Sequence, residues 1–264
     1  AGGGSGTKTL GGAVTVAGVF TVDTLVTTAM EGNNLTVTDE TDINGTITIS
    51  TATLDANGAF DATGGTITFT DAGNLNLDST VTSLGTLSDN FGTVIYDGVD
   101  QVVFSDVYYS LTAGGGSGTK TLAGAVTVAG DLTIDTDVTI AMDTHDLTVT
   151  NATDIDGTLA VADNTLTLDG SSDIDGTITI STGTVDANGT FDATSGFVTF
   201  TNVGNLTLFS TVIDLGTLSN NFSTVIYDGV DQVVFSDVYY NLTAGGGSGT
   251  KTLGGNVTVE NDLT

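Results

Sequence analysis

The sequence predicts an all-β protein, a parallel β-solenoid with about 20 residues and three short strands in each coil. Three observations carry this prediction. Val, Ile, Leu and Phe alternate with Thr along the chain, and this period of two is typical of strands. Apolar triplets recur about every 20 residues. Pro is absent, so every residue can donate its backbone N–H to a neighbouring strand.

Three interleaved series of apolar residues define the predicted coil, and each is expected to form one side of it. The series are Val126, Leu147, Leu166, Val185 and Leu206; Val138, Leu159, Ile178 and Val198; and Leu132, Ile155, Ile174 and Phe191. Gly, Asn and Asp fall between them, as corners with unusual backbone angles require. With coils ~4.8 Å apart, about thirteen coils would make a rod roughly 60 Å long.

The phrase AGGGSGTKTL occurs three times and divides the chain into long repeats. We expect these to span residues 1–112, 113–243 and, for the start of a third, 244–264, all in one rod. Neither end carries the atypical capping repeat that protects a solenoid from uncontrolled association. The rod is therefore expected to continue end to end, by covalent repeats or by subunit stacking, which makes the protein its own predicted partner.

The second repeat is longer than the first by 19 residues, and this insertion supports the solenoid. The tetrapeptide DIDG occurs there at Asp154 and again at Asp173, whereas the first repeat has a single DING at Asp42. An insertion that leaves both flanks intact should equal one whole coil. The alternative fold, an antiparallel sandwich array, does not predict such an insertion.

Charge and composition exclude several classes of function. The chain has 32 acidic residues, 3 Lys and no Arg, which gives a net charge of −29. Nucleic acids and anionic membrane surfaces both require clustered basic residues, so neither is an expected partner. No apolar run is long enough for membrane insertion as a helix. Without Cys, thiol chemistry and disulfides are excluded as well.

Catalysis has few groups to draw on, and we do not expect an enzyme. The one His, His145, stands where the first repeat has Asn33 or Asn34, which indicates a turn residue. Carboxylate pairs can cleave glycosidic bonds. In solenoid enzymes, however, such pairs are normally accompanied by basic residues in the cleft.

The doubled DIDG motif is the predicted metal site. In a strand, Asp154 and Asp156 point to one side, and Asp173 and Asp175 should lie one coil further along. Carboxylates about 5 Å apart repel one another unless they share a cation, and Ca²⁺ prefers oxygen ligands. Ca²⁺ is thus the one cofactor the sequence suggests. The alternative is a hydrated corner where the charges are screened.

All three lysines, Lys8, Lys120 and Lys251, lie in the Gly-rich phrase. A phosphate-binding loop would need a helix after it, and the calcium-binding nonapeptide has Asp where this Lys stands. The phrase is therefore expected to form a tight corner at the repeat junction. There Lys would pair with a carboxylate such as Asp106 or Asp237. An isopeptide crosslink from Lys to Asn or Asp is the alternative.

The aromatic block VIYDGVDQVVFSDVYY interrupts the coil pattern once in each repeat. Its tyrosines are predicted to form a lateral contact between rods or a contact with a ligand. The alternative is that they fill a wider core. The residues are Tyr96, Tyr108, Tyr109, Tyr227, Tyr239 and Tyr240.

Threonine pairs suggest a remote third function. The motif TIT at Thr46–Thr48 recurs at Thr66–Thr68, so the Thr side chains could form an outward ladder of the kind that binds ice. In the second repeat Leu159–Val161 interrupts this ladder. Ordinary solvent-facing Thr is therefore the expected role.

The segment VYYNLTAGGGSGTKTLGGNVTV, residues 238–259, resembles repeats of very large secreted bacterial surface proteins, the filamentous-haemagglutinin-like and adhesin-type β-solenoids. The resembling motif is structural and occurs in both long repeats. It implies an extracellular, cell-surface location and a role as the rod of a filament, stalk or adhesin shaft. A module that binds carbohydrate or another surface is the alternative, and it would need exposed aromatic side chains.

Overall fold

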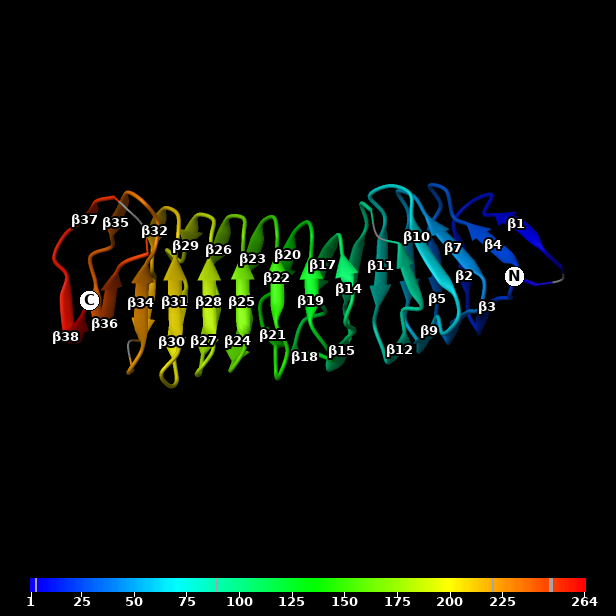
Figure 1. The fold of residues 1–264 in the computed structure, drawn as a ribbon. Coiled ribbons are helices and arrows are strands. Elements are labelled where there is room, and N and C mark those ends of the chain that lie inside the picture. Colours follow the sequence, from blue (N-terminus) through cyan, green and yellow to red (C-terminus); the bar gives the residue numbers. More distant parts are fainter. Residues whose placement is uncertain (3, 89, 220, 247–248) are drawn as a thin grey trace.

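The computed structural model describes residues 1–2, 4–88, 90–219, 221–246 and 249–264. Within them the chain is all-β without a helix and forms an elongated stack of about 13 coils (Figure 1). Successive coils follow one another along the rod, and the two termini lie at opposite ends. The predicted parallel β-solenoid of about 20 residues per coil is confirmed. The described strands pair in parallel, so the antiparallel alternative is wrong.

The strands in the described residues form six sheets, and three of these sheets begin at β1, β2 and β3. The five-stranded sheet contains β1 (Gly6–Thr9), β4 (Val26–Ala29), β7 (Thr46–Ile49), β10 (Thr66–Phe69) and β13 (Thr86–Ser88). The four-stranded sheet contains β3 (Phe20–Val22), β6 (Thr41–Ile43), β9 (Phe60–Asp61) and β12 (Val81–Ser83). The eleven-stranded sheet contains β2 (Val14–Val16), β5 (Leu35–Val37), β8 (Thr53–Ala56), β11 (Asn74–Leu77), β14 (Thr93–Tyr96), β17 (Ser110–Ala113), β20 (Leu132–Ile134), β23 (Thr153–Ile155), β26 (Ser172–Ile174), β29 (Phe191–Asp192) and β32 (Val212–Asp214).

The other three sheets begin later in the chain. The seven-stranded sheet contains β15 (Gln101–Val103), β18 (Gly118–Leu122), β21 (Val138–Ala141), β24 (Thr158–Ala162), β27 (Thr177–Ile180), β30 (Phe197–Phe200) and β33 (Thr217–Ser219). The nine-stranded sheet contains β16 (Val107–Tyr108), β19 (Val126–Val128), β22 (Leu147–Val149), β25 (Thr165–Leu168), β28 (Thr184–Ala187), β31 (Asn205–Leu208), β34 (Thr224–Tyr227), β36 (Val238–Ala244) and β38 (Thr258–Leu263). The two-stranded sheet pairs β35 (Gln232–Val234) with β37 (Lys251–Leu253).

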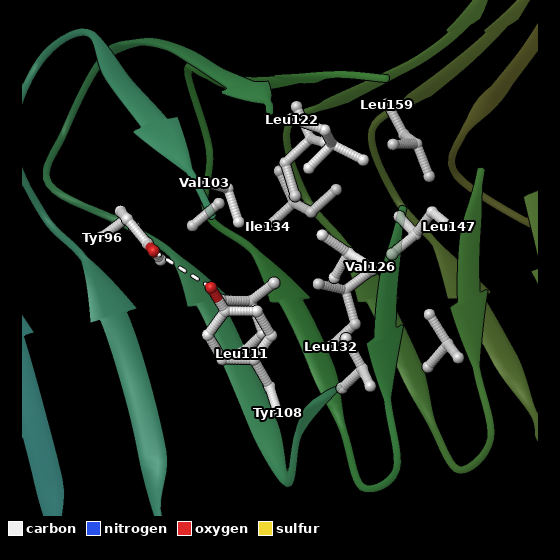
Figure 2. Close-up of a cluster of buried hydrophobic side chains, with 14 of the residues drawn as sticks. Tyr96, Val103, Tyr108, Leu111, Leu122, Val126, Leu132, Ile134, Leu147 and Leu159 are labelled. Carbon is white, nitrogen blue, oxygen red and sulfur yellow. Dashed lines mark hydrogen bonds between the residues drawn. The ribbon is translucent and has the colours of Figure 1, made fainter. Parts of the chain in front are cut away.

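The core follows from the alternation within each strand. In β27, Ile178 and Ile180 are buried while Thr177 and Thr179 are partly exposed, and the same pattern recurs in most strands. Each fully buried large apolar side chain contributes ~1.5–3 kcal/mol relative to exposure. The coils therefore stack around one continuous apolar interior, part of which Figure 2 shows.

The register confirms the first apolar series residue by residue, from Val126 through Leu147, Leu166 and Val185 to Leu206.

The other two predicted series contain errors of two residues. Ile140, rather than Val138, pairs with Leu159. Ile134, rather than Leu132, pairs with Ile155.

Phe191, the last member of the third series, also has a different partner, because it pairs with Ser172 rather than with Ile174. A shift of two residues keeps every side chain on the same face of its strand. Hydrophobic alternation therefore could not detect these errors.

Three strands per coil have a consequence for the long repeats. In its described part, the first repeat contains seventeen strands, β1 to β17, before its opening strand recurs as β18, and seventeen is not a multiple of three. The copies of one sequence therefore lie on different sides of the rod. The strand VTV lies in the eleven-stranded sheet as β2 and in the nine-stranded sheet as β19. Each repeat thus turns its sequence by one third of a coil.

The pairing of Asp154 with Asp173 means that one coil here takes 19 residues. Deleting residues 154–172 joins Thr153 to Asp173 and leaves all later strands on their own sides. We expect this variant to unfold cooperatively in urea with little change in β-sheet circular dichroism per residue, because repeat stability is nearly a sum over neighbours.

A deletion of residues 158–168 serves as the control, because it removes two strands and leaves the third strand of the coil. This variant should lose cooperative unfolding, since every later strand meets the wrong neighbour. Equal behaviour of the two variants would contradict the three-strand coil.

Candidate functional site at the repeat junction

The aromatic block is where the backbone ladders are interrupted, and we call it the junction: residues 93–122 and their copies 224–253. At the first junction the four- and five-stranded sheets end at β12 and β13, and two other sheets begin at β15 and β16. Of the sheets in the described part of the chain, only the eleven-stranded one passes through, from β14 to β17. At the second junction it is the nine-stranded sheet that passes through, from β34 to β36. Backbone groups at a junction therefore need other partners on two sides of the rod.

Two tyrosines supply part of this replacement from inside the core. The hydroxyls of Tyr96 and Tyr108 lie 3.1 Å apart and point toward each other (Figure 2). Phe104 N–H donates to the Tyr96 hydroxyl at 3.2 Å, and the Tyr108 hydroxyl donates to Phe104 O at 2.8 Å. The bend after β15 thus keeps both its backbone groups paired, as buried backbone requires.

The second junction repeats this arrangement. The Tyr227 and Tyr239 hydroxyls lie 3.0 Å apart, and both contact the backbone of Phe235. Their rings meet edge to face with centroids 6.4 Å apart. This geometry favours aromatic attraction beyond simple area burial.

The predicted surface contact is wrong for these four tyrosines. Tyr96, Tyr108, Tyr227 and Tyr239 have no exposed surface, so they fill the core, as the alternative held. Burial raises the pKa of Tyr96 to about 12 and also raises the pKa of Tyr227 and Tyr239, because a phenolate would lose its hydration. The phenols of Tyr96, Tyr227 and Tyr239 therefore remain protonated at physiological pH.

The other two tyrosines of the block do reach the surface. Tyr109 is 37% exposed, and its ring centroid lies 5.7 Å from that of the exposed Phe91. Tyr240 is partly exposed and lies 5.1 Å from Phe222. A contact with another rod or a ligand stays a prediction for these two aromatic pairs.

A glutamine clamps each junction to the preceding coil. The buried Gln101 donates from Nε2 to Leu77 O at 2.7 Å and to Ser79 O at 2.8 Å, and its Oε1 accepts from Gly98 N–H. Gln232 makes the equivalent bonds at the second junction. Sequence reasoning missed this pair, although a signal was present: these are the chain's two Gln residues, and both lie in the block.

The three lysines occupy different environments. Lys120 is fully buried, and its Nζ donates to Gly98 O and to Val99 O. Lys251 is partly buried and donates to Gly229 O, whereas Lys8 is exposed.

The predicted ion-pair partners of these lysines are wrong. Burial lowers the pKa of Lys120, and the nearby Asp97 and Asp100 act against that lowering, not Asp106. Lys251 likewise contacts the Gly229 carbonyl rather than Asp237. The reason is that Lys packs on the loop before the glutamine strand, not on the loop after it.

The Gly-rich phrase allows this approach. Gly115 adopts φ +87°, and a Cβ there would lie 1.6 Å from Asp97 O. Gly118 adopts φ +104°, and its Cβ would lie 1.8 Å from Val99 O. Both positions therefore require glycine for conformation and for space.

The DIDG aspartates are brought together in part. Asp154 pairs directly with Asp173, and Asp173 pairs with Asp192, which the sequence analysis did not include. Asp156 and Asp175 lie in the turns that follow the strands. Burial and the neighbouring carboxylates raise the pKa of Asp154 and Asp173.

The stacked residues Asp154, Asp173 and Asp192 form an aspartate column along the rod, and no metal-binding arrangement is described with it. Among the described residues, no group of three or more His, Cys, Asp or Glu side chains is placed to hold a metal ion. Ca²⁺ binding therefore stays a prediction that the register alone supports.

The threonine ladder is more continuous than expected. Thr46 pairs with Thr66 and Thr48 with Thr68 in the first repeat. In the second repeat Thr158 pairs with Thr177, and the ladder is interrupted by Ala160, which pairs with Thr179, and by Phe197, which pairs with Thr177. Ice binding remains an untested alternative.

The geometry places this chain in the class of parallel β-solenoid repeat proteins, with a specialised junction in each long repeat. No family model, curated protein or solved structure matches the chain. The resemblance to secreted adhesin repeats therefore stays an expectation. The described residues contain no helix with the length and apolarity that a membrane crossing requires.

The buried Lys120 and the exposed Lys8 provide a matched pair for testing the junction. Lys120→Met leaves the Gly98 and Val99 carbonyls without their donor, so the free energy of unfolding should fall by ~1–3 kcal/mol. Lys8→Met should change it by less than about 0.5 kcal/mol, as for an ordinary surface substitution. Urea denaturation measures both, and equal losses would contradict a structural role for the buried lysine.

The aspartate column predicts a rod that is more stable in weak acid than at neutral pH. The raised pKa values mean that the folded chain holds protons more tightly than the unfolded chain. This contribution is fully present below the unfolded pKa and is lost as pH rises through the folded pKa. The melting temperature should therefore rise as the pH is lowered from 7 toward about 4.

Asp173→Asn removes the central charge of this column. It should raise stability at pH 7 by about 0.2–0.5 kcal/mol, since exposed charges are largely screened. It should also flatten the pH dependence, whereas Asp39→Asn, outside the column, should leave that dependence unchanged. A melting temperature that falls steadily on acidification would contradict the predicted stabilisation of the rod in weak acid.

Proposed function

We propose that the chain is a structural rod, a segment of an extracellular filament, stalk or adhesin shaft. The observation that carries the proposal is the continuous apolar interior, which runs from coil to coil along the stack. Backbone ladders join the coils along the rod, and strands of this kind resist extension and bending collectively. The role needs no substrate, cofactor or catalytic group, and we propose none.

The charge supports the same role. A net charge of −29 on a chain of this size keeps neighbouring rods apart in solution. End-to-end continuation and an extracellular location are part of the proposal.

A second candidate function is recognition of a carbohydrate or another surface. The exposed pairs Phe91–Tyr109 and Phe222–Tyr240 favour it, because aromatic faces stack on apolar faces of ligands. Binding on a glycan array that is lost in Tyr109→Ala combined with Tyr240→Ala would support this function. The buried Tyr96 is unsuitable as a test position.

Small-angle X-ray scattering tests the rod. About 13 coils at ~4.8 Å predict a rigid particle roughly 60 Å long, with repulsion between particles at low salt that disappears near 0.5 M NaCl. A compact particle, or a flexible one whose length distribution is broad, would contradict the proposal.

On source cells, antibodies to this segment should label the outer surface without permeabilisation.

A further inference from the structure

Each junction contains a cavity between two strands that follow one another on the same side of the rod but are not paired. At the first junction, a cavity of about 360 Å³ is lined by Val81 of β12 and by Val102 of β15, among others. At the second, a cavity of about 610 Å³ lies between β32 and β35. We call each of these cavities the junction groove. Because a groove occurs at both junctions, it is a regular feature of the repeat.

Strand edges form both walls of the second groove. In a parallel ladder, alternate residues direct their backbone N–H and C=O to the same neighbour. Gln232 and Val234 are bonded to β37, through Gln232 N–H to Thr250 O at 3.2 Å and Gly254 N–H to Val234 O at 2.9 Å. Val233 between them therefore directs its backbone groups toward β32.

The opposite wall has the same character. Phe191 N–H donates to Thr211 O at 3.0 Å, and Phe191 pairs in register with Val212. The backbone N–H and C=O of Thr211 are thus directed toward β29, and those of Val212 are directed toward β35. The groove therefore lies between two backbone edges, which is the arrangement that accepts an added strand.

Apolar side chains line the groove and its rim. Phe209, Ile213 and Val233 line it and are 49%, 52% and 56% exposed, respectively. A patch of exposed apolar side chains of this kind marks an interaction site. Asp231 also lines the groove, and the whole chain is strongly acidic. The occupant that fits is apolar on alternate residues and basic at its ends.

We propose that each junction groove binds an extended segment of a basic polypeptide, which adds as a strand between β12 and β15 or between β32 and β35. Main-chain hydrogen bonds to the two edges provide affinity, the exposed apolar side chains select the residues that face them, and the acidic surface attracts the flanking Lys or Arg. This interaction goes beyond the rod function, because scattering would give the same rod length whether or not the groove binds.

The test uses a fluorescein-labelled peptide, Lys-Thr-Val-Thr-Val-Thr-Val-Lys with blocked ends, titrated with the whole chain and followed by fluorescence anisotropy. We expect saturable binding at two sites per chain. A peptide N-methylated on alternate residues keeps its charge but loses one hydrogen-bonding edge, so it should bind at least about tenfold more weakly. Replacing both Lys by Glu should weaken binding similarly.

Variants of the protein provide a second part of the test. Val102→Pro combined with Val233→Pro removes the two N–H groups that face the grooves and should abolish binding, while Val102→Ile with Val233→Ile keeps both the N–H groups and the apolar side chains and should retain it. The N-methylated peptide gives the same information without any risk to folding. Absence of binding, or equal binding of the N-methylated peptide, would overturn the proposal. So would self-association of the chain by sedimentation that the proline variant abolishes, since the occupant would then be a second copy.

Discussion

Backbone hydrogen bonds between successive coils are the interaction on which the rest of this structure depends. A single coil of about 20 residues cannot bury its apolar side chains alone, and it becomes stable when its strands pair with the coils on either side. The absence of Pro and the Thr-rich exterior follow from this requirement. Where pairing fails on two sides, at the junctions, side-chain hydrogen bonds from Gln101, Tyr96, Tyr108 and Lys120 take its place.

The fold could be predicted from the sequence for two reasons. Apolar triplets recur at about the length of one coil, and apolar residues alternate with Thr within each strand. The series through Val126 and Leu147 has the predicted register, although the coil length there changes from 21 to 19 residues. In the other two apolar series, Val138 and Leu132 were predicted two residues away from the true partners, Ile140 and Ile134. A shift of two residues keeps the same face of the strand, so side-chain alternation cannot reveal it.

The junction was harder to predict, for a different physical reason. Aromatic residues in an irregular block could lie outside or inside, and the decision rests on whether each hydroxyl finds a backbone partner. For Tyr96 and Tyr108 that partner is Phe104, which the strand pattern does not reveal. The partner of Lys120 likewise depends on a close approach that Gly115 and Gly118 permit. Such contacts follow from the loop conformation rather than from sequence spacing.

The two proposals meet at the junction. There the ladder continues on one side of the rod only, so the junction is the natural place for the rod to bend away from that side. A peptide strand bound in the groove would extend the ladder on a second side and oppose such bending. Occupancy of the groove would therefore set the stiffness of the rod as well as recruit a partner.

The one-third turn between repeats acts as a threefold screw operation on the surface pattern. The aspartates Asp42 and Asp61 lie in the four-stranded sheet, whereas Asp154 and Asp173 lie in the eleven-stranded sheet on another side. The charged columns of successive repeats thus wind around the axis. Two parallel rods cannot avoid each other's charge by rotating about their long axes. Side-by-side packing of rods would therefore require counter-ions, because no rotation of one rod about its axis would remove the repulsion.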